Sequence, residues 1–236
     1  MKRSVNAAGR RLEYTLIQSR RADVLFQALP QAGIRVYAPK YLGLRIVDDM
    51  VRQRAAELID MQRAVEARLE AGRRAHPVSD GSPILVEGRQ LTLRLFRGGR
   101  VRDEIAGGEY RLALPDPGDE DAVRAAVKSA LSARALARIR QRLDYYIPRI
   151  GRAPGRVAVR DQKTRWGSCS GKGNVNFNWK LIMAPPQVLD YVVLHELCHL
   201  YEFNHSPRFW ALVERQMPEY AVWKKWLKAH GDDLYL

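Results

Sequence analysis

One stretch, Leu194-His195-Glu196-Leu197-Cys198-His199-Leu200, constrains this chain more than any other part of it. Successive residues of an α-helix are rotated by about 100°, so His195 and His199 would stand one turn apart on the same face. Two imidazoles in that arrangement can bind one metal ion. Glu196 would lie beside such an ion rather than on it, where its carboxylate can take a proton from a metal-bound water. The spacing therefore predicts a metal-binding helix with a general base.

A third histidine, His205, follows six residues after His199. It completes a set of three nitrogen ligands if the chain turns back after the helix. Three protein ligands leave a fourth position for water, which is typical of a catalytic zinc site rather than a structural one. We therefore expect one Zn²⁺ ion held by His195, His199 and His205, with Glu196 as the catalytic base.

The residues around this motif favour a buried helix. Pro185 and Pro186 stand where a helix begins. Apolar residues then occupy nearly every side of the helix: Val188, Leu189, Val192, Val193, Leu194, Leu197 and Leu200. A helix that is apolar all round is buried, and buried polar groups need partners. A metal ion would supply a partner to both histidines of the motif.

Composition and cysteine usage exclude several classes of protein. Hydrophobic residues make up 46% and charged residues 28% of the chain, as in a globular protein. No apolar run approaches the length that spans a bilayer, and no apolar segment follows the basic start as in a signal peptide. Cys169 and Cys198 are the only cysteines, which excludes a disulfide scaffold and suits a reducing compartment. We expect a cytoplasmic protein without membrane contact.

The net charge of +14 bears on the partners of the protein. Such a balance permits binding of nucleotides or nucleic acid. A solvated basic surface explains the same charge equally well, so the charge by itself does not decide between them.

The first half of the chain is predicted to be rich in strands, with no internal repeat apparent. After ten polar residues without predicted structure, apolar runs predict three strands between Leu12 and Tyr37, then one long helix from Leu44 to Arg74. Apolar segments at 84–86, 90–96 and 109–114, with turn signals at Gly98-Gly99 and Gly107-Gly108, predict an antiparallel set of strands. The run 115–119 is the clearest boundary. We expect a β-rich region over residues 1–115 and a catalytic region over 116–236, which could form one compact unit.

The second half reads as helix, hairpin and further helices, so the predicted fold class is α+β. A helix should begin at Asp119 or Glu120 and end at about Ile147, before Pro148. Strands at 156–160 and 175–179 should form a hairpin, with a polar loop over 161–174 between them. Ser206-Pro207 should begin another helix, followed by a last one. Their aromatic residues, among them Phe209, Trp210, Tyr220, Trp223 and Trp226, are expected in the core.

The predicted hairpin is a candidate substrate-binding element. In zinc peptidases, an edge strand beside the metal can bind an extended peptide by backbone pairing. The candidate substrate-binding residues are Arg165, Trp166, Asn176 and Asn178. The alternative is that the hairpin only packs against the metal-binding helix.

Several motifs together resemble the YgjP-like metallopeptidase family, a bacterial branch of the zincins that is similar to the SprT-like and Wss1-like peptidases. The resemblance is strong over about residues 160–215 and weaker over 15–39. It is carried by the segments Thr164–Ser170, Asn178–Leu181, Ala184-Pro185, Leu189–Leu200 and Asn204–Trp210. The resemblance implies a zincin core of the minigluzincin type, one zinc ion, and the ligands and base already named. Its likeness to SprT-like enzymes suggests protein substrates near DNA, by analogy only.

The spacing to the third histidine equals that of metzincins, but Glu202 stands where metzincins carry glycine. The turn toward the metal must then be made elsewhere, and Asn204 tolerates left-handed backbone. If the helix continued, Glu202 would point to the same side as His195 and His199. Glu202 is therefore a candidate for supporting a ligand, or for replacing His205 as the ligand.

Two other functions and several further residues stay open from the sequence. A zinc site could hydrolyse nucleoside triphosphates or other phosphoanhydrides, with Arg165, Lys163 and Lys172 binding phosphates. The chain could instead be a basic nucleic-acid-associated module with a structural zinc ion. Cys169 could approach the zinc ion or be an inert, partly buried thiol. The candidate groups for stabilising an oxyanion are Tyr201, Tyr220, Arg165 and His230.

Overall fold

The computed structural model describes residues 1–236 except 8, 30–31, 163–164 and 235, and leaves out the side chains of residues 73 and 75. The chain forms two compact units, Met1–Pro77 and Val78–Leu236. The division therefore falls between 77 and 78 rather than at the predicted 115/116. The reason is that the strands after residue 78 share one hydrophobic core with the helices that follow. No helix among the described residues is both long and apolar enough to cross a bilayer.

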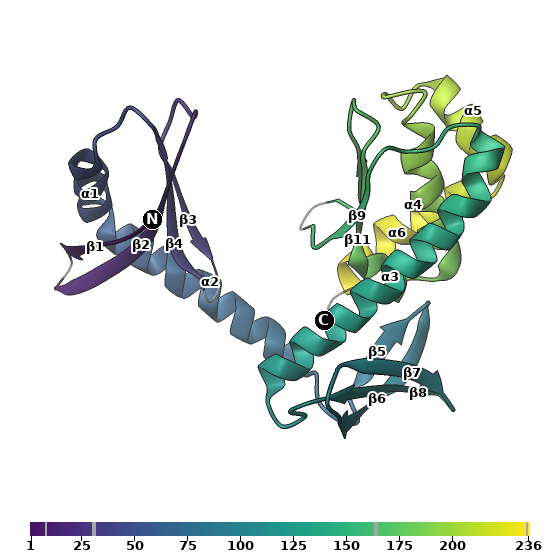
Figure 1. The fold of residues 1–236 in the computed structure, drawn as a ribbon, viewed down its shortest axis with the longest axis horizontal. Coiled ribbons are helices and arrows are strands. Elements are labelled where there is room, and N and C mark those ends of the chain that lie inside the picture. The colour runs from purple at the N-terminus through teal and green to yellow at the C-terminus, as the bar shows by residue number, and fades with distance from the viewer. Residues whose placement is uncertain (8, 30–31, 163–164, 235) are drawn as a thin grey trace. The chain divides into compact units, whose positions relative to one another are not determined.

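The first unit is a four-stranded sheet with two helices (Figure 1). Its strands are β1 (Lys2–Ala7), β2 (Arg10–Ser19), β3 (Leu25–Leu29) and β4 (Gly33–Pro39), in the order β1-β2-β4-β3. The three predicted strands are confirmed, but β1 was expected to be unstructured. The prediction of one long helix from Leu44 to Arg74 was also wrong. The segment forms α1 (Leu44–Gln53) and α2 (Ala55–Ala75), because the backbone at Arg54 leaves the helical region.

The second unit begins with another four-stranded sheet. Its strands are β5 (Pro83–Val86), β6 (Arg89–Arg97), β7 (Arg102–Ala106) and β8 (Glu109–Leu114). The predicted all-antiparallel arrangement is wrong, because β6 and β8 are parallel while β7 pairs antiparallel at the edge. The β7–β8 turn is tight because Gly107 and Gly108 both have positive φ, 58° and 79°.

These two sheets are built alike, which the sequence reading missed. The order β5-β6-β8-β7 repeats the order β1-β2-β4-β3, with parallel and antiparallel pairs in the same places. Gly9 and Gly88 occupy the first turn of each sheet, with φ values of 72° and 73°. Gly88 has a further constraint, because a Cβ there would lie 2.8 Å from the Cα of Pro185. The second sheet thus docks on the segment that leads into the metal-motif helix.

A long helix, α3 (Glu120–Ile150), lies between the second sheet and the rest of the unit. It begins as predicted, since the Asp119 side chain accepts hydrogen bonds from the backbone N–H groups of residues 121 and 122. Pro148 does not end it, because a proline in the last turn removes only one backbone bond. The helix instead ends at Gly151, whose φ of 78° is left-handed.

The third sheet contains β9 (Val157–Arg160), β10 (Gly167–Cys169) and β11 (Val175–Asn178) in the order β10-β11-β9. The predicted hairpin between the first and last of these strands is wrong, because β9 and β11 are parallel. The antiparallel pair is β10 with β11, and β10 lies inside the segment expected to be a loop. Trp179 is not part of β11 but begins a short 3₁₀ helix, η1 (Trp179–Met183).

The last elements are α4 (Pro186–Cys198), α5 (Pro207–Gln216), α6 (Tyr220–His230) and a 3₁₀ turn, η2 (Gly231–Asp233). The predicted starts of α4 and α5 are confirmed. The Ser206 side chain accepts a hydrogen bond from the backbone N–H of Phe209 and so caps α5. Helix α4 contacts α3, α5, α6 and β10, which places the metal motif in the interior of the second unit.

Candidate metal centre

Helix α4 carries His195 and Glu196 in its last turn, and His199 is the residue that caps its C-terminal end. Its buried residues include Val192, Val193, Leu194 and Leu197, as a helix apolar on all sides requires. The N–H groups of residues 200 and 201 bond to carbonyls three residues back, which tightens the last turn. The helix therefore stops before Glu202, and the chain is free to fold back toward the motif.

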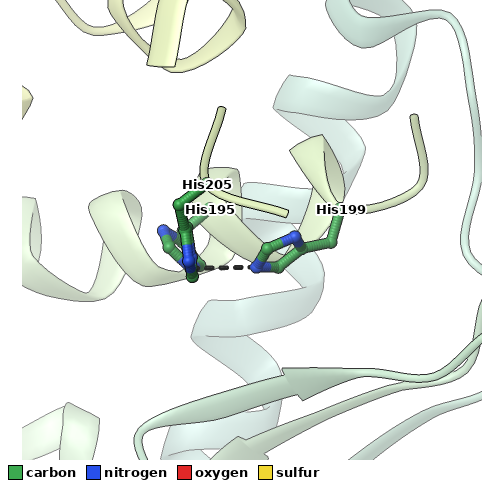
Figure 2. A group of neighbouring side chains, drawn as sticks. All are labelled: His195, His199 and His205. Carbon is green, nitrogen blue, oxygen red and sulfur yellow. Dashed lines mark hydrogen bonds between the residues drawn. The ribbon is translucent and has the colours of Figure 1, made fainter. Parts of the chain in front are cut away.

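The three histidines converge on one point (Figure 2). The Nε2 atom of His195 lies 3.1 Å from Nε2 of His199 and 3.1 Å from Nε2 of His205. The candidate ligand atoms of the three residues all lie within 4.8 Å of one another. A single hydrogen can bridge only one of these nitrogen pairs well, whereas a cation among them would accept all three lone pairs. The donor set therefore fits a metal ion such as zinc.

A backbone carbonyl orients the second histidine. Nδ1 of His199 lies 2.9 Å from the carbonyl oxygen of Glu202. A carbonyl only accepts hydrogen bonds, so Nδ1 of His199 carries the hydrogen and Nε2 presents its lone pair to the centre. The sequence left open whether Glu202 supports or replaces a ligand. Its backbone supports His199, while its carboxylate is not among the converging ligand atoms of the described residues.

His205 reaches the centre without the left-handed turn expected at Asn204. Among the described residues, Glu87 is the only non-glycine residue with positive φ. The chain reverses instead through the tightened end of α4 and the capped start of α5 at Ser206. His205 precedes this cap directly, so the start of α5 fixes its backbone.

Aromatic rings support the three imidazoles, as expected of a core beneath the motif. Phe209 is fully buried, and its ring centroid lies 4.8, 4.6 and 4.9 Å from those of His195, His199 and His205. It thus touches every ring of the centre. Trp210 is only partly buried and stacks on His205 with 5.5 Å between centroids.

The environment of His195 keeps its imidazole neutral. Burial lowers the pKa of His195 from 6.5 to about 3, and the neighbouring His199, His205 and Lys224 add to the effect. Burial also lowers the pKa of His205, and the nearby His199 and Lys224 lower it further by smaller amounts. Neutral rings are the form that binds a metal ion.

Glu196 has the burial expected of a general base held away from water. Its side chain is 5% exposed, and Oε2 has no hydrogen-bond partner within the described part of the chain. Burial raises the pKa of Glu196 from 4.5 to about 8, against a smaller lowering by Arg165. An orphaned buried carboxylate is costly for folding, which indicates a role at the centre rather than in packing.

Gly167 of β10 makes room for this carboxylate. A Cβ atom at Gly167 would lie 2.4 Å from Oε1 and 2.7 Å from Cγ of Glu196. Such distances are closer than any stable contact, so no other residue fits here without moving the carboxyl group.

We therefore expect Gly167→Ala to lower hydrolytic turnover at least tenfold, because misplacement of a reacting group by about 1 Å can cost a hundredfold. Metal affinity should stay near that of the wild type, since the three atoms nearest a Cβ at Gly167 all belong to Glu196, which is not one of the proposed ligands. Gly171→Ala is the matched control, because a Cβ at Gly171 meets nothing within 4 Å. Turnover and zinc affinity are measured for both variants, and equal turnover in the two would contradict the assigned contact.

The structure separates the candidate substrate-binding residues. Asn178 is buried and its amide donates to the carbonyls of Gln162 (2.8 Å) and Arg165 (3.1 Å), so it holds the loop rather than facing a substrate. Asn176 bonds weakly to Ser168 across the sheet, at 3.4 Å. Trp166 lies against Gly231, where a Cβ would be 2.9 Å from the indole. Arg165 is exposed and acts on Glu196 through its charge.

Most other candidates have structural contacts. The Tyr201 hydroxyl donates to the carbonyl of Ile150, and His230 pairs with Asp233. Tyr220 stacks on Trp210. Lys163 lies outside the described residues, and Lys172 is exposed in the β10–β11 turn.

Cys169 is not among the converging ligand atoms, although its position on β10 lets the charge of Glu196 act on it. Burial raises the pKa of its thiol, which makes it less reactive. The geometry therefore supports an inert, partly buried thiol at Cys169.

Two residues of the centre were missed from the sequence. Gly167 carries no side-chain chemistry, and only its contact with Glu196 reveals its role. Lys224 follows Tyr220 by four residues on α6, so the sequence indicates that the two share a helix face. It does not indicate that this face lies near the metal centre.

The comparisons with known proteins bear on the family of the chain. The family model described as the YgjP-like metallopeptidase domain matches residues 24–230. The crystal structure of the metallopeptidase zymogen of Pyrococcus abyssi abylysin is similar with 27% identity and a TM-score of 0.33. That alignment covers 35% of this chain and 84% of the other. None of the curated proteins matches the chain. The match over 24–230 shows that this chain belongs to the YgjP-like metallopeptidase family.

Proposed function

We propose that the chain is a zinc-dependent peptidase in which His195, His199 and His205 hold one zinc ion and Glu196 is the general base. The observation that carries the proposal is the buried carboxylate of Glu196, whose Oε2 has no hydrogen-bond partner among the described residues, next in sequence to the first of three converging imidazoles. The chemistry that zinc supplies when bound is a lowered pKa for its water and polarisation of the substrate carbonyl. Helix α4 and the β10-β11-β9 sheet would be the zincin-type core.

Glu196 would act twice in peptide hydrolysis. Its carboxylate first takes a proton as water attacks the carbonyl carbon, and then gives that proton to the leaving amine. Burial helps both steps, because a raised pKa brings the carboxyl group close to the pH at which it can accept and release a proton. Arg165 favours the ionised form that must be present at the start.

The edge strand β10 is the element we propose for binding an extended peptide. It lies at the edge of the sheet order β10-β11-β9, so among the described residues a strand pairs with only one side of its backbone, and the other side could pair with a peptide. Gly167 in β10 lies against Glu196, so a peptide paired there would run past the catalytic carboxylate. Main-chain pairing would make the site tolerant of many sequences.

A second candidate is hydrolysis of nucleoside triphosphates or other phosphoanhydrides. Two cations outside the motif act on the site, which is the specific support for this candidate. The charge of Arg165 acts on Glu196, and the charge of Lys224 acts on His195 and His205. Such a field would attract phosphates as well as acidic peptides. The family match favours the peptidase.

One experiment separates the two candidates. Zinc-loaded protein is incubated with a mixture of an unfolded protein and nucleoside triphosphates, and the products are identified by mass spectrometry. Protein with Glu196→Gln serves as the blank. New peptide termini made only by the wild type are expected. Nucleotide products without new termini would overturn the peptidase proposal in favour of the second candidate, and no products of either kind would contradict both.

A further inference from the structure

The third histidine of the centre has little of its own to hold its ring in place. His205 is exposed and lies in the irregular segment between α4 and α5. Within the described residues its one hydrogen-bond contact is through Nε2 to His195, the atom that would bind the metal. His199, by contrast, is fixed by a carbonyl at Nδ1. Something other than a hydrogen bond must orient the ring of His205.

The ring of Trp210 is placed to do so. The two rings are nearly parallel, with 5.5 Å between centroids and 22° between planes. Trp210 is itself stacked on Tyr220, with 5.3 Å between centroids and an angle of 15°. The ammonium nitrogen of Lys224 lies 3.9 Å from the centroid of the Trp210 ring, within the range of a cation–π interaction. Tyr220 and Lys224 are one turn apart on α6, so one helix face holds the indole.

The same rings connect the third ligand back to the first. Tyr220 also lies nearly parallel to Tyr191, with 6.5 Å between centroids. Tyr191 is one helical turn before His195 on α4 and makes an edge contact with its ring at 5.7 Å. The chain of rings His205–Trp210–Tyr220–Tyr191–His195 therefore joins α4, α6 and the start of α5, and α4 contacts both other helices.

We propose that Trp210 is a positioning residue of the metal centre, held by Tyr220 and Lys224, and that it sets the orientation of the His205 imidazole. This inference rests on the proposed role of His205 as a ligand, but not on the identity of the substrate. Phe209 contacts the His205 ring only edge-on, so without Trp210 the exposed imidazole would keep more rotational freedom and would lose it on binding the metal. Loss of groups that orient metal ligands typically costs 10- to 100-fold in metal affinity.

The test measures metal binding and not hydrolysis, so it remains valid whichever substrate the protein cleaves. The dissociation constants of Zn²⁺ and Co²⁺ are determined for full-length protein by chelator competition, and the visible absorption of the Co²⁺ form reports its coordination. The variants are Trp210→Leu, which removes the aromatic face, Trp210→Phe, which restores part of it, and His205→Ala as the reference for a lost ligand. Trp226→Leu is the matched control, because the ring contact of Trp226 is with His230 rather than with any ring of the centre.

Trp210→Leu is expected to weaken metal binding roughly 10- to 100-fold and to move the Co²⁺ spectrum toward that of His205→Ala. Trp210→Phe should recover most of the affinity, because it restores an aromatic face against the His205 ring. Trp226→Leu should bind like the wild type. If Trp210→Leu does not fold, Tyr220→Leu decides, because it removes the support behind Trp210 and should weaken binding several-fold. Unchanged binding and spectrum in these variants, or an equal loss in Trp226→Leu, would overturn the proposal.

Discussion

Glu196→Gln is expected to lower hydrolysis by roughly 10²- to 10⁴-fold, the usual contribution of a general base. Glutamine has nearly the shape of glutamate but cannot accept the proton of the attacking water. Zinc binding should stay within a few-fold of the wild type, because Glu196 is not one of the converging ligands. The measurements are the rate of peptide-bond cleavage at saturating zinc and the zinc dissociation constant.

Glu202→Gln is the control for this first prediction. Glu202 lies near the centre, but its contact with His199 is made by the backbone carbonyl, which the substitution leaves in place. Its activity should therefore stay close to that of the wild type. If Glu196→Gln retained turnover, or if it lost zinc together with activity, the role assigned to Glu196 would be wrong.

The metal-free protein is expected to lose stability as pH rises, and Glu196→Gln is expected to prevent that loss. The pKa of Glu196 is raised from 4.5 to about 8, so the folded state binds a proton more tightly than the unfolded state does. The stability linked to this group is fully present below pH 4.5 and is lost as pH rises toward 8. At 1.36 kcal/mol per pH unit, the loss amounts to roughly 3 to 5 kcal/mol.

His195 acts in the opposite direction. Its pKa is lowered from 6.5 to about 3, so the folded state binds this proton less tightly than the unfolded state does. The contribution of His195 to folding stability is therefore fully present above pH 6.5 and is lost as pH falls toward 3. Without metal, the protein should therefore be most stable between about pH 4.5 and 6.5. Chemical denaturation in the presence of a chelator, at several values of pH, measures this profile.

Glu196→Gln should flatten the alkaline side of this profile, and its stability should keep rising up to about pH 6.5, where the contribution of His195 is complete. Glu214→Gln is the matched control, because Glu214 is an exposed residue of α5 and its substitution should not alter the profile. A wild-type protein whose stability is constant from pH 5 to 8.5 would contradict the burial of an unpartnered Glu196.

The elements that could be predicted from the sequence are those with a strong internal pattern. Helix α4 has prolines at its start and apolar residues on all sides, and α5 has a capping serine followed by proline. Strands β2, β4 and β6 alternate apolar and polar residues, since one face of each is buried. In these elements local preference and tertiary packing agree.

The three strands that were missed, β1, β7 and β10, are all edge strands. An edge strand has a neighbour on one side only, and polar or small residues suffice there. β7 is largely charged and β10 is Gly-Ser-Cys, so neither carries an alternating apolar signal. Their formation depends on β8 and β11, which lie later in the chain. The similarity of the two four-stranded sheets was missed for a related reason, because it lies in pairing order rather than in obvious sequence identity.

The candidate site was easier to predict than the strand pairing, because the positions of its reactive groups follow from helical geometry. His195 and Glu196 are neighbours in the last turn of α4, and His199 caps that turn four residues after His195, still with helical backbone angles. Their supports come from elsewhere: a carbonyl from Glu202, space from Gly167 and stacking from Trp210. These depend on tertiary contacts, which spacing along the chain does not encode.

The central claim is that three histidines of this chain hold one zinc ion, and X-ray absorption at the zinc edge tests it most directly. Protein reconstituted with one equivalent of zinc should show nitrogen and oxygen neighbours at about 2.0–2.1 Å, with the outer-shell signature of three imidazoles. His205→Ala should remove one imidazole from that signature, while Cys169→Ser should leave it unchanged. A sulfur neighbour at about 2.3 Å, or a spectrum that His205→Ala does not alter, would contradict the three-histidine centre.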